Sequence, residues 1–184
     1  MRKIVAGTFL SLDGVMESPD KWHFPYSDDK MGEAVGSQMA EADAMLLGRV
    51  TYQEFASYWP QQSDDTPGAD FMNGVAKYVV STTLQNVDDW QNSTLIDGTN
   101  FVAEMQRLKE SPGKQINVTG SARLVQSLLR EKLLDELRLL VHPIVVGGGK
   151  RLLEGETGQH PLRLVDYQIF DTGVLYLTYE PADR

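Results

Sequence analysis

The sequence predicts an α/β fold, with a mixed, mostly parallel sheet, helices on both faces and an antiparallel hairpin at the C-terminal end. Strand-like apolar runs alternate with segments of helical apolar spacing along most of the 184 residues, as in sheets built from β/α units. The tail instead places two strand-like segments around Asp171-Thr172-Gly173, which predicts a tight turn between antiparallel strands. The length favours one domain over residues 1–184.

The elements can be justified in chain order from apolar spacing and turn residues. The first strand ends at Asp13-Gly14, and Met31, Val35 and Met39 share one face of the first helix. Pro67-Gly68 closes a polar loop, and Ser111-Pro112-Gly113 ends a later helix. Strands are expected over 4–11, 44–47, 77–81, 115–119, 137–146, 162–170 and 174–180, and helices over 30–42, 51–59, about 101–108 and about 124–129.

Composition excludes several functional classes. The net charge of -9 argues against a nucleic-acid or anionic-membrane partner, and no apolar stretch approaches membrane-spanning length. The absence of cysteine excludes disulfides and thiolate metal sites. His23, His142 and His160 lack ligand spacing, so no metal is expected, and His142 is interpreted as a hydrogen-bonded core histidine. We expect a cytoplasmic protein.

Three glycine-containing junctions follow predicted strands and are suited to anions. A helix N-terminus presents unpaired N–H groups, and glycine lets a phosphate approach the backbone. Several such junctions at the carboxyl ends of strands predict a ligand with several phosphates, of which a dinucleotide is the simplest. The junctions are Gly48-Arg49-Val50-Thr51, Thr119-Gly120-Ser121-Ala122-Arg123 and Gly147-Gly148-Gly149-Lys150-Arg151.

Each junction also has a purely structural interpretation. Gly48 could end a strand before a helix capped by Thr51, and Ser121 could cap the next helix. The Gly147 run could be a flexible turn between a strand and a short helix. The chain has neither a Gly-x-Gly-x-x-Gly after its first strand nor a P-loop motif, so it is neither a typical Rossmann dehydrogenase nor a P-loop NTPase.

Several sequence blocks resemble the dihydrofolate reductase superfamily. The chain is most similar to small stand-alone relatives of the reductase domain of bifunctional riboflavin-biosynthesis enzymes. The similarity extends in order from residue 11 to residue 149. The blocks are Ser11-Leu12-Asp13-Gly14, residues 42–52 with Gly48-Arg49-Val50-Thr51, Asp135-Glu136-Leu137, and residues 142–149 with the triple glycine.

The resemblance implies an NADPH-dependent reductase of a small heteroaromatic, pterin-like or pyrimidine-like substrate. It implies that Arg49 contacts the 2′-phosphate and that the start of the helix after Gly120 holds the pyrophosphate. It also implies a homodimer. With the junction glycines, the expected cofactor site comprises Gly48, Arg49, Thr51, Ser81, Thr82, Thr119, Gly120, Ser121, Ala122, Arg123, Gly147 and Gly148.

Two positions on the substrate side depart from the family pattern. Ser27 stands where an ungapped alignment expects the pterin-binding carboxylate, with Asp28 one position later. Val15 stands where the riboflavin-type domains carry a basic residue. These departures leave a non-catalytic NADP(H)-binding module as an alternative to the reductase.

Candidate substrate and catalytic residues each retain a structural alternative. Trp22, Phe24 and Met31 are candidate walls of the substrate pocket, or plain core residues. Asp13 and Asp28 are candidate proton relays or substrate anchors. Alternatively, Asp13 forms an Asp-Gly turn and Asp28 caps a helix.

Overall fold

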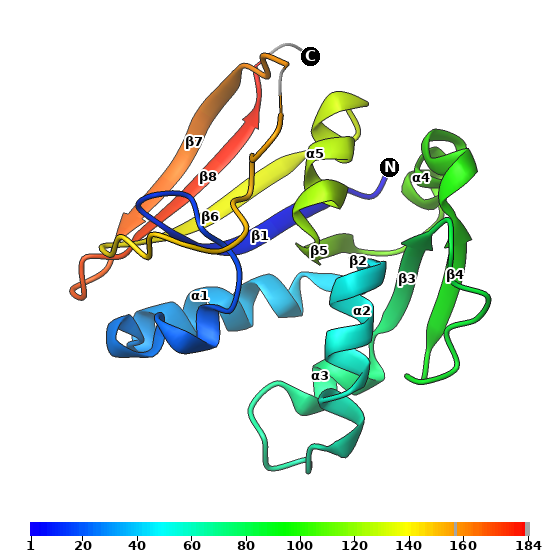
Figure 1. Ribbon diagram of the computed structural model, residues 1–184, viewed down its shortest axis with the longest axis horizontal. Coiled ribbons are helices and arrows are strands. Elements are labelled where there is room, and N and C mark those ends of the chain that lie inside the picture. Colours follow the sequence, from blue (N-terminus) through cyan, green and yellow to red (C-terminus); the bar gives the residue numbers. More distant parts are fainter. Residues whose placement is uncertain (157, 183–184) are drawn as a thin grey trace.

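The computed structural model describes residues 1–156 and 158–182. Its strands form one sheet in the order β4-β3-β2-β5-β1-β6-β8-β7 (Figure 1). Pairing is parallel from β4 to β6 and antiparallel where β8 joins β6 and β7, which confirms the predicted mixed sheet. The strands are β1 (Ile4–Ser11), β2 (Ala42–Gly48), β3 (Ala76–Ser81), β4 (Ser93–Asp97), β5 (Gln115–Gly120), β6 (Glu136–His142), β7 (Leu162–Ile169) and β8 (Leu175–Pro181).

Five α-helices in the described residues cover the two faces of the sheet. On one face, Leu46 packs in a cluster with Met105 and Leu128 from two of the later helices. On the other face, its neighbour Leu47 packs with Tyr52, because successive side chains of a strand point to opposite faces. Figure 1 shows these two layers of helices, one on each face of the sheet. The helices are α1 (Asp29–Ala40), α2 (Arg49–Ala56), α3 (Ala69–Gly74), α4 (Phe101–Glu110) and α5 (Ala122–Arg130).

The structure corrects several expected boundaries. It adds β4 and α3, which the sequence pattern did not predict. The strand expected over 137–146 already ends at His142, and α1 ends at Ala40 so that β2 can begin at Ala42. In the part of the chain that the structure describes, no helix follows Gly147, so the predicted third strand-to-helix junction is wrong.

His142 is fully buried in a cluster of aromatic side chains, as predicted for a core histidine. Its Nδ1 lies 2.8 Å from the carbonyl oxygen of Leu140. The rings of Phe9 and Trp22 meet its ring edge-on. Burial lowers the pKa of His142, so the ring is neutral near pH 7. No helix among residues 1–156 and 158–182 is long and apolar enough to cross a membrane.

Candidate active site

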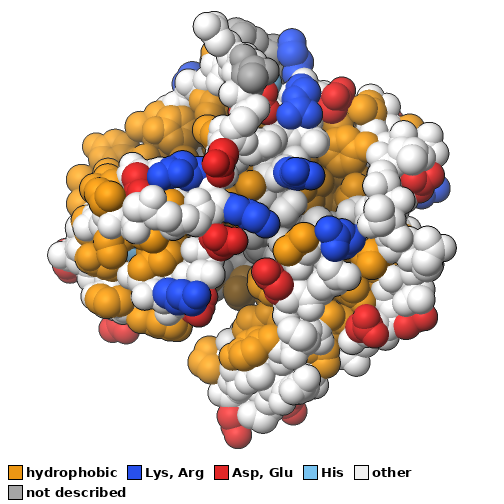
Figure 2. Space-filling model, viewed as in Figure 1, with side chains coloured by type: hydrophobic (Ala, Val, Ile, Leu, Met, Phe, Trp, Pro, Cys, Tyr) orange, Lys and Arg blue, Asp and Glu red, His pale blue; other side chains and the backbone are white. Residues whose placement is uncertain are grey.

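A cleft of about 1510 Å³ opens where the carboxyl ends of β2, β3 and β5 meet. Ligands of open α/β sheets gather at this edge because the connecting loops leave it uncovered. Figure 2 shows the face with a hollow that contains hydrophobic side chains and with Lys and Arg side chains near it. The expected cofactor residues that line the cleft are Gly48, Arg49, Thr51, Ser81, Thr82, Thr119, Gly120, Ser121, Ala122 and Arg123.

The loops that follow β2 and β5 interlock at the floor of the cleft. A Cβ atom added at Gly48 would lie 2.6 Å from Oγ of Ser121, and one added at Gly120 would lie 2.8 Å from Oγ1 of Thr51. Each glycine therefore makes room for a hydroxyl side chain of the other loop. Because β2 and β5 are adjacent parallel strands, this packing sets the N-termini of α2 and α5 side by side.

The two helix starts differ in the donors that they leave unpaired. No side chain of the described residues caps α2, so the N–H groups of its first turn face the cleft without a side-chain acceptor. At α5 the hydroxyl of Ser121 accepts a hydrogen bond from Leu124 N. Exposed Arg49 and Arg123 stand beside these starts, and neither forms an ion pair within the described residues. Unpaired cations beside free N–H groups fit the phosphates of a nicotinamide dinucleotide.

A third loop, after β3, completes this part of the cleft. Ser81, Thr82 and Gly98 line it, and a Cβ added at Gly98 would lie 3.0 Å from Cγ2 of Thr82. The hydroxyl of Ser81 accepts hydrogen bonds from the N–H groups of Thr83 and Leu84. Ser81 therefore shapes the loop, and the hydroxyl of Thr82 is the more available of the two.

The glycine run after β6 braces another loop instead of opening a helix. Gly147 and Gly148 are not among the residues that line the cleft. The carboxylate of Asp13 accepts hydrogen bonds from Val146 N at 3.0 Å and Gly147 N at 2.8 Å. Val15 pairs with Arg151 in an isolated β-bridge. The run therefore has a structural role in the loop, and its predicted cofactor role stays a prediction.

Asp13 is placed as a turn and loop acceptor. Hydrogen bonds from Ser11 Oγ and from the two backbone N–H groups lower its pKa to about 2. Its carboxylate is thus ionised near neutral pH and has no proton to donate. Asp28 lies at the N-cap of α1, where its Oδ1 accepts from Met31 N at 2.8 Å. Neither aspartate lines the cleft, which favours the structural alternative for both.

The three candidate pocket walls also lie outside the lining of the cleft. Trp22 is buried, and its indole N–H donates to the carbonyl of Glu17 at 3.1 Å. Met31 is buried in a core cluster with Leu140, whereas the side chain of Phe24 is exposed. The burial of Trp22 and Met31 therefore favours the interpretation of both as core residues.

The inner part of the cleft is formed by residues that the sequence pattern did not single out. They are Gly7, Thr8 and Phe9 from β1, Val35, Gln38 and Met39 from α1, Met45 from β2, Asn117 from β5 and Leu140 from β6. The available signal was the spacing of Gln38, which stands seven residues after Met31 on the apolar face of α1. A polar residue on such a face is informative because burial requires a partner.

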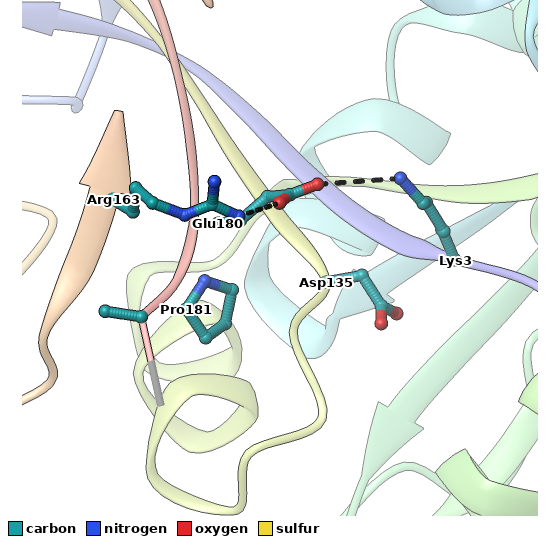
Figure 3. Close-up of a pocket in the computed structure, with 6 residues that line it drawn as sticks. Lys3, Asp135, Arg163, Glu180 and Pro181 are labelled. Carbon is teal, nitrogen blue, oxygen red and sulfur yellow. Dashed lines mark hydrogen bonds and ion pairs between the residues drawn. The ribbon is translucent and has the colours of Figure 1, made fainter. Parts of the chain in front are cut away.

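A smaller pocket of about 200 Å³ lies at the opposite edge of the sheet (Figure 3). Its charges pair with one another, since Arg163 lies 3.1 Å and Lys3 lies 3.8 Å from Glu180. Lys3 also pairs with Glu136 at 2.6 Å. Among the described residues, this network has no surplus cation for a phosphate. No cluster of potential metal ligands occurs among residues 1–156 and 158–182.

Comparison with known proteins identifies relatives over nearly the whole chain. A family model described as the RibD C-terminal domain matches residues 2–176. The uncharacterized protein YyaP of Bacillus subtilis (strain 168) is 29% identical over 182 residues, which cover 97% of this chain and 94% of YyaP.

Two solved structures share the fold at low sequence identity. A diaminohydroxyphosphoribosylaminopyrimidine deaminase/5-amino-6-(5-phosphoribosylamino)uracil reductase from Thermotoga maritima superimposes with a TM-score of 0.70 and 14% identity over 98% of this chain and 57% of its own. Dihydrofolate reductase from Enterococcus faecalis, complexed with NADP(H) and RAB-propyl, gives a TM-score of 0.67 and 13% identity over 98% of this chain and 97% of its own. The chain belongs to the RibD C-terminal domain family, a group of reductases with the dihydrofolate reductase-like fold.

Proposed function

We propose that the protein is an NADPH-dependent reductase of a small, planar, pterin-like or pyrimidine-like heteroaromatic substrate. One observation carries the proposal. The unpaired cations Arg49 and Arg123, the uncapped start of α2 and the apolar inner compartment all belong to a single cleft. The NADP(H) in the Enterococcus faecalis relative supports the choice of cofactor.

Different residues along the cleft would bind the cofactor and the substrate. Arg49 and Thr51 would hold phosphate at the start of α2, and Ala122 and Arg123 would do so at the start of α5. The bound cofactor supplies the hydride, while the apolar compartment holds the substrate ring in line and excludes water. None of the compartment residues from β1, α1, β5 and β6 is titratable near pH 7. The proton of the reaction must therefore reach the substrate from solvent or from the rim of the cleft.

NADPH binding followed by cofactor fluorescence tests the proposal. The purified protein should bind NADPH saturably at micromolar levels and more tightly than NADH. Because a charge-assisted hydrogen bond contributes about 1.5–3 kcal/mol, Arg49→Ala should weaken NADPH roughly tenfold or more and leave NADH nearly unchanged. Among the residues that the structure describes, the side chain of Arg49 forms a hydrogen bond only with Gln53 Oε1, at 3.0 Å on the surface, so the variant should fold normally.

Arg107→Ala is the matched control. Arg107 is an exposed arginine that pairs with Glu104 on α4 and does not line the cleft. Its removal should change the affinity for neither cofactor. Equal losses of affinity for NADPH and NADH in Arg49→Ala would show that Arg49 contacts a phosphate that both cofactors share. Absence of saturable NADPH binding by the wild type would refute the proposal.

A non-catalytic NADP(H)-binding module is the second candidate. The capping role of Asp28 favours it, because that role leaves the inner compartment without a carboxylate. Both candidates bind NADPH, so binding alone does not separate them. A screen of heteroaromatic metabolites for NADPH consumption does, since any substrate-dependent oxidation by the pure protein excludes the non-catalytic module.

We also propose a homodimer, formed through the C-terminal edge of the sheet. β7 is an edge strand, and its exposed side chains Leu164, Tyr167 and Ile169 share one face, because they pair with alternate residues of β8 on either side of a bulge. Apolar residues gathered on an exposed edge are typical of an interface. Light scattering should give twice the mass of the chain for the wild type and the mass of one chain for Tyr167→Lys. A monomeric wild type refutes this proposal.

The cytoplasmic location stays a prediction.

A further inference from the structure

The carboxamide of Gln38 is an unpaired polar group in the inner compartment of the cleft. Gln38 is only 8% exposed, yet its side chain lines the cleft. Within residues 1–156 and 158–182, no group donates a hydrogen bond to this carboxamide or accepts one from it. The amide nitrogen and oxygen of Gln38 are not among the fully buried polar atoms that lack a partner, so the solvent of the cleft reaches them. A ligand that pairs with both atoms replaces their hydrogen bonds to water and reads their donor and acceptor.

The backbone around Gln38 is fixed by its neighbours. The amide of Asn117 donates from Nδ2 to the carbonyl of Gln38 at 2.9 Å, and its Oδ1 accepts from Gln115 at 3.1 Å. Asn117 thus attaches the last turn of α1 to β5 through Nδ2, while its Oδ1 is occupied by a neighbour on the same strand. The side chain of Gln38 is left to face the cleft.

Gly7 fixes the position of the carboxamide itself. A Cβ atom added at Gly7 would overlap the amide and lie 2.9 Å from Cδ of Gln38. The carboxamide therefore lies directly against the backbone of β1, in a space that any larger residue at position 7 would occupy. Preorganisation of this kind is what a recognition group needs, because little rotamer freedom is lost on binding.

We propose that Gln38 is the specificity-determining residue of the substrate compartment. It selects a neutral planar ring with a hydrogen-bond donor and an acceptor side by side, such as the N–H and C=O of a cyclic amide. The carboxamide donates to the ring carbonyl and accepts from the ring N–H, as glutamine does when it pairs with a base edge in bidentate fashion. The inference rests on the proposed function only in that the ring is taken to be the substrate.

The chemistry of the compartment opposes a cationic ring. A carboxylate accepts two hydrogen bonds and so favours a protonated aminopyrimidine with two donors, whereas a carboxamide offers one donor and one acceptor. The carboxylate closest in sequence to the expected position, Asp28, is engaged at the helix cap. Phe9, Val35 and Leu140 make the lining apolar, which disfavours an unpaired charge.

Two matched bicyclic probes test the inference. Quinazoline-2,4-dione is neutral and presents N–H beside C=O, whereas quinazoline-2,4-diamine is a cation near pH 7 and presents donors. Their affinities are measured by fluorescence titration of the full chain. The wild type should prefer the dione, Gln38→Met should lose roughly tenfold to hundredfold in dione affinity, and Gln38→Glu should reverse the preference.

Further variants keep the test independent of folding and of the cofactor proposal. Gly7→Ala displaces the carboxamide without removing it and should reproduce the loss in Gln38→Met. Gln168→Met, on the exposed edge strand β7, is the matched control and should bind both probes like the wild type. The inference is overturned if Gln38→Met keeps full dione affinity, or if the wild type binds neither probe or prefers the diamine.

NADPH titration of the same variants separates the two proposals. The phosphate loops lie at the ends of β2 and β5, so Gln38→Met should bind NADPH normally. Unchanged probe selectivity together with normal NADPH binding overturns only the role of Gln38. Probe selectivity that depends on Gln38 in a protein that fails to bind NADPH overturns only the proposed cofactor.

Discussion

Replacing Gly120 by alanine should damage both stability and cofactor binding, for two separable reasons. Gly120 has φ +152°, a region open almost only to glycine, so any side chain there strains the backbone by about 1–3 kcal/mol. The added Cβ would also lie 2.8 Å from Oγ1 of Thr51, and moving that hydroxyl off its rotamer adds about 0.5–1.5 kcal/mol. We therefore expect Gly120→Ala to lower the free energy of unfolding by about 2–4 kcal/mol.

Gly48→Ala separates contact from strain. Gly48 has φ -79°, which suits any residue, so its penalty comes from contact alone: a new Cβ would lie 2.6 Å from Oγ, 3.2 Å from Cβ and 3.3 Å from the backbone N of Ser121. Urea unfolding should rank the losses Gly120→Ala above Gly48→Ala. Gly36→Ala, with nothing within 4 Å in the middle of α1, should stabilise by about 0.5–1 kcal/mol.

The contact in each loop can be tested by a double-mutant cycle. Ser121→Ala removes the Oγ that would clash in Gly48→Ala, so the double variant should recover part of the lost stability. NADPH affinity should fall in both glycine variants, because each pushes apart the two loops that carry the helix starts. If Gly120→Ala is as stable as the wild type and binds NADPH normally, the interlocking of the two loops is not what positions the site.

Four further outcomes follow from the side chains of Lys77, Asp28 and Asp13. Burial lowers the pKa of Lys77 from 10.5 to about 8. Between these two pH values the unfolded chain binds more protons than the folded protein, so stability rises with pH. From pH 8 to 10.5, the free energy of unfolding of the wild type should therefore rise relative to that of Lys77→Met by on the order of 1–3 kcal/mol. Urea titrations of the two proteins at several pH values measure this difference, and parallel pH profiles would contradict the buried cation. Asp28→Ala should cost about 1 kcal/mol through loss of the cap on Met31, with little effect in Asp28→Asn, as thermal melts can measure. Dihydrofolate turnover should be weak or absent, and efficient turnover abolished by Asp28→Asn would restore a folate role. The pKa of Asp13 is about 2 in the folded protein, against an ordinary value of 3.8, so its stabilising contribution is present above pH 4 and is lost as the pH falls toward 2. The stability of Asp13→Asn should lack this acid dependence. An acid profile identical to that of the wild type would count against the three hydrogen bonds to the carboxylate.

Part of the candidate site could be predicted because its signals are local. Gly48-Arg49 and Gly120-Ser121 each place glycine and polar side chains at the end of a buried strand and the start of a helix. Both junctions are complete within a few residues, so spacing alone finds them. The Gly147 run has the same local composition, but its N–H groups are used by Asp13, 134 residues away from Gly147 in sequence. Local composition cannot distinguish a loop that binds phosphate from a loop whose N–H groups bind a carboxylate distant in sequence.

The missed elements and residues depend on contacts between distant parts of the chain. The helix α3 has only six residues, and β4 is a five-residue edge strand, so neither is long enough to produce a periodic pattern. Gln38 belongs to the site because Asn117 holds its backbone and Gly7 leaves room for its amide, and both lie on other elements.

The sequence by itself determined the alternation of strands and helices, the antiparallel end, the buried histidine and the two helix starts, because apolar periodicity and glycine placement are local properties. Only the tertiary structure decided that the loops after Gly48 and Gly120 interlock, that Asp13 and Asp28 serve as acceptors for backbone N–H groups, and that Gln38 faces the cleft. The register of β2 on β5 brings Gly48 close to Ser121, and the place of β1 beside β5 brings Gly7 close to Gln38; such approaches arise from the packing of the whole sheet.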